Sequence, residues 1–291
     1  MDYLSIRELV EAAEAKNMCI GALVLRDQVL EMEQSEKDIW TRMSDSLRVM
    51  VDSVHEGMKE GVRSTSGLTG GDARRMLDYS ACGGITGTFM TRAMARALAV
   101  SEYNAAMGRI VASPTAGSCG IMPGCLVSLL EDKNVEWEVV VRSMFTAAAF
   151  GMVIAQKASI AGAQGGCQAE CGSAAGMTAA ALVEIMGGTP TQAAHACAMA
   201  IKNQLGLVCD PVAGLVEIPC IKRNVAGIMV AFSAADMALS GIESKIPVDE
   251  VIAAMKEVGD SMPCAMKETA MGGLANTPTG KRMREQVFGK E

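Results

Sequence analysis

Three cysteines lie where the sequence interrupts its helical pattern, and they are the first candidates for chemistry. Cys209 and Cys220 lie in LGLVCDPVAGLVEIPCIKRN, each beside a proline turn, and Cys167 follows the Gly165-Gly166 break. Proline lacks an N–H and clashes with the preceding turn, so Cys209 and Cys220 do not lie inside a continuous helix. Cys167 and Cys220 each open a predicted helix, whose N-terminus would lower the pKa of the thiol. Thiolates at such chain breaks are suited to holding a metal cluster.

Two other cysteine pairs lie close together in the sequence. Cys167 and Cys171 would share one face of a helix, and Cys119 and Cys125 form a second pair. Neither pair has the paired CxxC spacing of zinc sites. Iron–sulfur ligation favours the set at the chain breaks, because proline commonly neighbours a ligating cysteine. Three thiolates leave one iron of a four-iron cluster free to act as a Lewis acid. The residues alone leave metal ligands, nucleophiles and core thiols open.

A second irregular segment, GRIVASPTAGSCGIMPG, offers hydroxyl groups and exposed backbone N–H groups. Ser113, Thr115 and Ser118 supply the hydroxyls, and Gly117 contributes an N–H ahead of a helix predicted to begin near Met122. Such a loop can bind a carboxylate. An ordinary helix–helix connection is the alternative interpretation.

The composition predicts an all-α protein that positions these segments. The chain has 291 residues, of which 50% are hydrophobic but only 3% aromatic, with 23 methionines and 30 glycines. Strand-favouring β-branched and aromatic residues are sparse, and small side chains let helices approach closely. No break in composition divides the chain. We expect one domain over residues 1–291, with an amphipathic helical segment at 1–60, a cluster-binding catalytic core at 61–280 and a tail at 281–291.

Local patterns predict individual helices. One long helix is expected across QVLEMEQSEKDIWTRMSDSLRVMVDSVHEGMKEG, in which Met43, Leu47 and Met50 recur at helical spacing. Thr189 followed by Pro190 predicts the N-terminus of another helix.

Charge and motifs exclude several classes of protein. The net charge is −7, and no basic run is interleaved with aromatic residues, which argues against nucleic acid as a partner. The loop RSTSGLTGGDARRM fits neither GxxxxGK[ST] nor GxGxxG, so nucleotide binding is not indicated. The N-terminus lacks a signal-peptide layout, and the apolar stretch SMFTAAAFGMVIAQ is too short for a spanning helix. We expect a cytoplasmic protein with reduced cysteines.

Four segments resemble those of the iron–sulfur-dependent L-serine dehydratases. They are GCQAECGSAAGMTAAALVEIMGG, LGLVCDPVAGLVEIPCIKRN, SPTAGSCGIMPG and ETAMGGLANTPTG. They occur in the same order with agreeing cysteine spacings, and the likeness extends from about residue 50 to about 280, most like the alpha chain of the two-subunit form. The resemblance implies that Cys167, Cys209 and Cys220 ligate a [4Fe–4S] cluster held by loops and helix N-termini, without pyridoxal phosphate.

The sequence also departs from that family. Relatives often carry valine in place of Cys171 and a small residue in place of Cys119, so both read as core or near-site thiols. No cysteine follows Cys264, which puts in doubt a C-terminal thiol that caps the fourth iron. The SSHT-like segment of single-chain relatives is absent. A beta chain is therefore expected as partner in a hetero-oligomer.

The resemblance implies conversion of L-serine to pyruvate and ammonia, with the open iron accepting the departing hydroxide. A general base must remove the Cα proton, and Glu170 and Lys157 are the candidates, although the base can also lie on the partner chain. The loop at Thr115, Gly117 and Ser118 would bind the substrate carboxylate.

The neighbours of Cys220 are further candidates. Arg223 and Asn224 would donate hydrogen bonds to cluster sulfide or to the substrate carboxylate. For Arg223, a surface cation at a helix start is the alternative.

Two other functions stay open. One is a cysteine-desulfidase-like reaction on the same scaffold, with sulfide as the leaving group. The other is a non-catalytic, cluster-bearing helical subunit or redox sensor.

Overall fold

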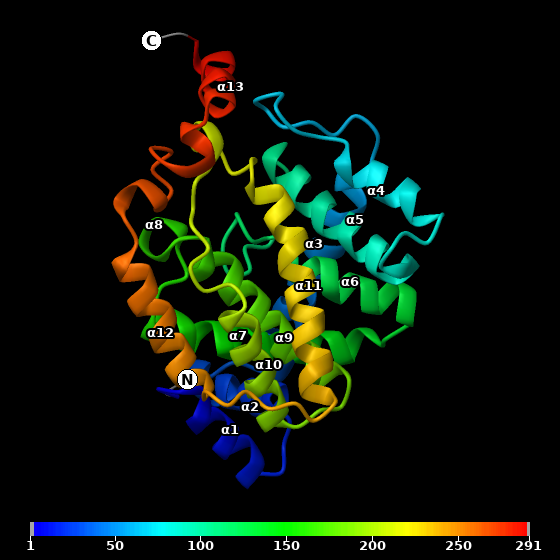
Figure 1. Ribbon diagram of the computed structural model, residues 1–291. Helices are drawn as coiled ribbons and strands as arrows, with labels where there is room; N and C mark the ends of the chain where they lie inside the picture. Colours follow the sequence, from blue (N-terminus) through cyan, green and yellow to red (C-terminus); the bar gives the residue numbers. More distant parts are fainter. Residues whose placement is uncertain (1–2, 290–291) are drawn as a thin grey trace.

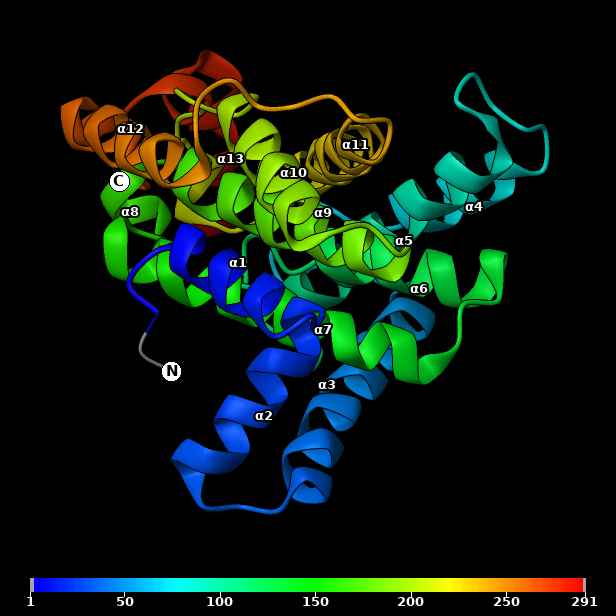
Figure 2. The same ribbon diagram turned by 90° about the horizontal axis from the view of Figure 1, so that it is seen from below.

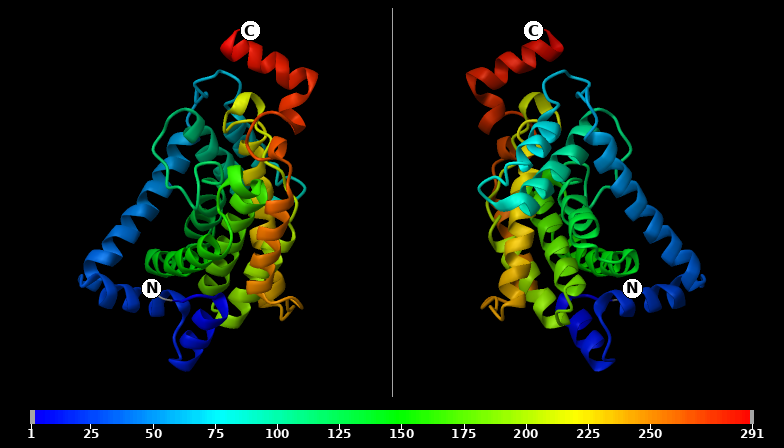
Figure 3. Two further views of the ribbon diagram at one scale, coloured as in Figure 1. Left: turned by 90° about the vertical axis from the view of Figure 1, so that its left-hand side faces the viewer. Right: turned by 90° about the vertical axis from the view of Figure 1, so that its right-hand side faces the viewer.

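The structure is a computed structural model that describes residues 3–289. These residues form helices and loops with no β-strand among them (Figure 1), which confirms the predicted all-α fold. Figure 3 shows α1 and α13 at opposite ends of the molecule. The α-helices are α1 (Ile6–Ala15), α2 (Ile20–Met32), α3 (Glu36–Gly57), α4 (Asp72–Ser80), α5 (Gly87–Ala105), α6 (Ile121–Lys133), α7 (Trp137–Lys157), α8 (Gly162–Gly165), α9 (Ser173–Ile185), α10 (Pro190–Lys202), α11 (Cys220–Leu239), α12 (Val248–Ser261) and α13 (Pro278–Phe288). The short helices are the π-helix η1 (Gln168–Gly172) and the 3₁₀ helices η2 (Val212–Gly214), η3 (Cys264–Met266) and η4 (Gly273–Asn276).

Helix α9 lies at the centre of the core. It packs against α7, α10 and α11 (Figure 2), and every residue from Ser173 to Val183 is buried. Its sequence, SAAGMTAAALVEI, is rich in alanine, so neighbouring backbones can approach closely. Gly151 of α7 illustrates the fit, since an added Cβ would lie 2.6 Å from the Cε atom of Met177.

The single long helix predicted for the N-terminal segment is wrong, because the structure has two helices there. Glu33 ends α2 with a left-handed backbone (φ 51°). Ser35 then caps α3, and its Oγ accepts a hydrogen bond from the backbone N–H of Asp38 at 3.1 Å. Helix α3 packs against α5, α6 and α7 and forms one flank of the molecule in Figure 3.

Other predicted helix starts are confirmed. Thr189 and Gln192 form a capping box at the start of α10, with Pro190 as its first helical residue, and Cys220 is the first residue of α11. Helix α6 begins at Ile121, close to the predicted start. Residues 281–288 of the expected tail belong to α13, and residues 290–291 lie outside the described part.

Helix α7 is long and apolar enough to cross a membrane by length and composition. The uncharged stretch is itself too short, as predicted, but the helix that contains it extends back to Trp137. Of its apolar window, 67% is buried, including the rings of Phe145 and Phe150. Such burial is typical of the core helix of a soluble protein.

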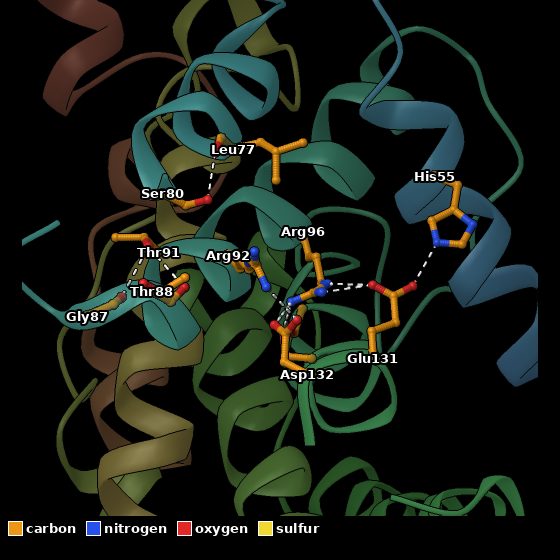
Figure 4. A network of polar contacts seen from close by, with 12 residues as sticks. His55, Leu77, Ser80, Gly87, Thr88, Thr91, Arg92, Arg96, Glu131 and Asp132 are labelled. Atoms are coloured by element: carbon orange, nitrogen blue, oxygen red, sulfur yellow. Dashed lines mark hydrogen bonds and ion pairs between the residues drawn. The ribbon is translucent and has the colours of Figure 1, made fainter. Parts of the chain in front are cut away.

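A polar network ties α3, α5 and α6 together (Figure 4). Arg96 of α5 is buried and bonds Asp132 Oδ2 at 2.6 Å and Glu131 Oε2 at 2.8 Å. The Nε2 atom of His55 lies 2.7 Å from the other oxygen of Glu131. Burial opposes ionisation of Asp132, but hydrogen bonds and charge from Arg96 and Arg92 outweigh it and lower the pKa of this carboxyl.

Candidate metal and active site

The structure brings two of the three predicted cysteine ligands together with a predicted catalytic residue. Ligand atoms of Cys167, Cys209 and Glu170 all lie within 4.8 Å of one another. Cys167 directly precedes η1, Cys209 lies in the extended segment before η2, and both are buried. Cys220 is also buried but lies outside this trio, at the start of α11. Burial and the charges of Cys167 and Glu170 raise the pKa of the Cys220 thiol to about 12.

Cys167 is the thiol most favoured as a thiolate. Hydrogen bonds from the thiols of Cys171 and Cys209, together with the nearby Arg223 guanidinium, lower the pKa of Cys167 to about 3. The hydrogen bond between Cys209 and Cys167, together with burial, raises the pKa of the Cys209 thiol. Cys171 therefore lies beside the site, as the sequence predicted for a near-site thiol. A thiolate is the form that binds metal.

Arg223 connects the cysteine loops and is not a surface cation. Its Nη1 donates to Cys167 Sγ at 3.3 Å and to the carbonyl of Val208 at 2.8 Å. Its Nη2 donates to Asp210 Oδ1 at 2.8 Å. The other oxygen of Asp210 accepts from the backbone N–H of Leu274 at 2.8 Å. Sequence reasoning missed Asp210, although its position directly after Cys209 was a signal.

Asn224 holds the backbone of the site, which differs from its predicted hydrogen bonds to cluster sulfide or to the substrate carboxylate. Its Nδ2 donates to the carbonyls of Gly117 at 2.8 Å and Cys220 at 2.9 Å, and its Oδ1 accepts from Gly120 N at 2.9 Å. Both of its N–H bonds are used, and only 1% of the residue is exposed. The amide thus fixes the 113–120 loop against the start of α11.

The 113–118 loop faces Glu170. Thr115 Oγ1 donates a short hydrogen bond to Glu170 Oε1 and lies 3.1 Å from Ser118 Oγ. A Cβ on Gly117 would lie 2.6 Å from the same carboxylate oxygen, so the close approach requires glycine. The hydroxyl of Ser113 is buried and has no hydrogen-bond partner among the described residues. The loop therefore presents hydroxyl groups beside a carboxyl, as its composition predicted.

The two candidate bases lie in different environments. Burial raises the pKa of Glu170 to about 7, and the charges of Cys167 and Glu268 act in the same direction, while Thr115 and Arg223 oppose them. A pKa near neutrality suits a general base. Lys157 is the exposed last residue of α7, and it is not part of the trio around Glu170.

Residues 264–276 run alongside the Cys209 segment, as Figure 1 shows in orange-red beside yellow-green. The N–H of Cys209 donates to the carbonyl of Met266 at 2.8 Å, and the N–H of Glu268 donates to the carbonyl of Cys209 at 2.7 Å. Sequence reasoning assigned no site residue here. Its only signal was the resemblance of ETAMGGLANTPTG to the family.

Comparisons with known proteins identify the family of this chain. The serine dehydratase alpha chain family matches residues 15–275. The chain is 50% identical over 288 residues to the probable L-serine dehydratase, alpha chain, of Bacillus subtilis (strain 168), which covers 99% of this chain and 96% of that protein. It is 45% identical over 283 residues to the L-serine dehydratase, alpha chain, of Peptoniphilus asaccharolyticus, with 97% of each covered. The L-serine dehydratase TdcG of Escherichia coli (strain K12) is 34% identical over 281 residues, and the match spans 62% of that longer protein. The chain belongs to the serine dehydratase alpha chain family.

Proposed function

We propose that this protein is the alpha chain of an L-serine dehydratase, a lyase that converts L-serine to pyruvate and ammonia. Relatives that cover almost the whole chain carry this name. The observation that carries the proposal is the meeting of Cys167, Cys209 and Glu170 within 4.8 Å, a combination of thiol ligands and a proton acceptor at one place.

The donor set fits an iron–sulfur cluster. The three predicted ligands, Cys167, Cys209 and Cys220, are buried thiols from three separate segments, and thiolate sulfur is the ligand such clusters prefer. We infer that these cysteines hold a [4Fe–4S] cluster and that the enzyme works without pyridoxal phosphate. When bound, such a cluster supplies a Lewis-acidic iron that stabilises a departing hydroxide.

The residues of this chain supply binding and proton transfer. The hydroxyls of Ser113 and Ser118 and the N–H of Gly117 lie on one loop and can bind the substrate carboxylate, whereas the hydroxyl proton of Thr115 is donated to Glu170. Glu170, positioned by Thr115, accepts the Cα proton. Loss of that proton and of hydroxide gives aminoacrylate, which tautomerises to an imine and reacts with water to give pyruvate and ammonia.

The working enzyme contains a second subunit in this proposal. Relatives that match the whole chain are named alpha chains, whereas TdcG, which bears no chain designation, is longer. We infer that a beta chain completes the enzyme as a hetero-oligomer and that the assembly is cytoplasmic.

Anaerobic reconstitution tests the cofactor and the activity in turn. We expect about four irons and four acid-labile sulfides per chain, with a brown chromophore. A Cys209→Ser variant should lose most of the iron, whereas Cys82→Ser, an exposed cysteine, should retain it. The reconstituted complex should form pyruvate from L-serine faster than from L-cysteine. Iron-free protein would overturn the cofactor assignment, and pyruvate from L-cysteine alone would favour the desulfidase reaction.

A further inference from the structure

Residues 264–276 bring a second carboxylate to the site. Glu268 has a left-handed backbone (φ 64°), a conformation that non-glycine residues seldom adopt and that clusters at functional sites. The hydrogen bond from its N–H to the carbonyl of Cys209 holds it there. Its backbone is therefore fixed relative to the cysteine loop.

The Glu268 carboxylate, the Glu170 carboxylate and the Cys209 thiol lie close together beside Gly162, which has no side chain to fill the gap. A Cβ on Gly162 would lie 3.0 Å from Cys209 Sγ, 3.3 Å from Glu170 Oε2 and 3.3 Å from Glu268 Oε2. Glu170 is buried and Glu268 is exposed. One carboxylate oxygen of each residue thus lies near the same point beside Gly162, and Glu170 is buried there while Glu268 is open to solvent.

The charge of Arg223 lowers the pKa of Glu170, but Glu268 has no ion-pair partner of its own among the described residues. Arg223 is already paired with Asp210 and directed at Cys167. Lys267, the neighbour of Glu268, lines a separate cavity with Ser159 and Asp260. Within residues 3–289, no lysine or arginine forms an ion pair with Glu268. A cationic group of the substrate is the natural complement to this carboxylate.

We propose that the Glu268 carboxylate binds the α-ammonium group of the amino-acid substrate. The inference rests on the proposed function and completes its substrate contacts. The hydroxyl-rich loop takes the carboxylate and Glu170 faces the Cα proton, which leaves the ammonium without a partner. An ammonium–carboxylate contact at Glu268 distinguishes an amino acid from the corresponding hydroxy acid, because a charge-assisted hydrogen bond is lost when the amine is absent.

The test uses Glu268→Gln in the reconstituted complex with its partner chain, with iron content as the check on cluster loading. The glutamine keeps size and hydrogen bonding but removes the charge. We expect KM for L-serine to rise about 10–100-fold, the loss of one charge-assisted contact, with kcat within a few-fold of wild type. The matched control is Glu257→Gln, an exposed carboxylate on α12, which should leave both constants unchanged.

A second probe separates ammonium binding from general damage. 3-Hydroxypropionate has the carboxylate and hydroxyl of serine but no amine, so its inhibition constant should be the same for wild type and Glu268→Gln. An unchanged KM for L-serine, a loss confined to kcat, or an equal weakening of 3-hydroxypropionate would each overturn the inference. Failure of the wild-type complex to dehydrate L-serine would instead overturn the proposed function.

Discussion

Arg223 joins three groups with two nitrogens, namely Cys167 Sγ, the Val208 carbonyl and the Asp210 carboxylate. The planar guanidinium makes this possible because its donors point in fixed directions. A lysine has the same charge but one nitrogen on a flexible stem. We therefore expect Arg223 to act mainly by positioning its three partners, a role for which its positive charge alone is not enough.

Arg223→Lys should weaken cluster retention although the charge is kept. Loss of a residue that orients a metal ligand typically costs about 10–100-fold in metal affinity. The measurement is iron content after reconstitution and the lifetime of the visible absorption during chelation. Arg282→Lys, at an exposed arginine of α13, is the control. Equal iron retention in both variants would contradict a positioning role.

Gly117→Ala should reduce turnover without unfolding the protein. The new Cβ would lie 2.6 Å from Glu170 Oε1 and force this carboxyl or its loop to move. A displacement near 1 Å at a catalytic group can cost about 100-fold in rate, so we expect kcat to fall by about that factor. Gly172→Ala is the matched control, because its new Cβ would lie 3.7 Å from the nearest atom, an ordinary van der Waals distance. If both variants turn over equally, Glu170 is not the acting group.

At the scale of helices, the network around Arg96 makes a pH-dependent contribution to stability. The pKa of Asp132 is lowered in the folded protein, below its unfolded value of about 3.9. The contribution is fully present above that unfolded pKa and is lost as pH falls through the folded one.

Asp132→Asn should lower the free energy of unfolding by about 1–3 kcal/mol at pH 7, because a buried arginine loses a charged partner. Urea denaturation at pH 7 and at acid pH measures this, and the difference from wild type should shrink in acid. Asp260→Asn removes an exposed partner of Lys256 and should cost less than about 1 kcal/mol. A pH-independent deficit in Asp132→Asn would argue against the ion pair.

Local patterns predicted most helices but not every break between them. Thr189 with Pro190 and the prolines before Cys220 act over one turn, so their effect is readable in the sequence. The break at Glu33 is not, because a glutamate rarely adopts the left-handed backbone found there. Nothing about a glutamate side chain indicates this left-handed conformation, which the packing of α2 and α3 imposes.

Site residues were predictable by type but not by role. Cys167, Cys209 and Glu170 lie together, but Cys220, predicted in the same ligand set, lies outside this trio. Asn224 bonds backbone groups that only the fold brings near. Glu268 was missed since its contact with the Cys209 segment joins distant parts of the chain. Tertiary placement, absent from any local pattern, decides such roles.

At the scale of the whole molecule, most of the hydrophobic core lies between helices and only a small part of it at the cysteine loops. Helix α9 and its neighbours pack through alanine and other apolar side chains. Chelation of iron should therefore abolish colour and dehydratase activity while the far-UV circular dichroism stays close to that of the loaded protein. Small zinc domains, in contrast, unfold without metal. Loss of most helical signal on chelation would show that the cluster is needed for folding.

The groups of the site come from four stretches, near residues 115, 168, 215 and 268. During synthesis the three proposed cysteine ligands are made before the stretch near residue 268, whose backbone hydrogen-bonds to Cys209. The Cys209 loop therefore gains its last backbone contacts only after all three thiols have been synthesised.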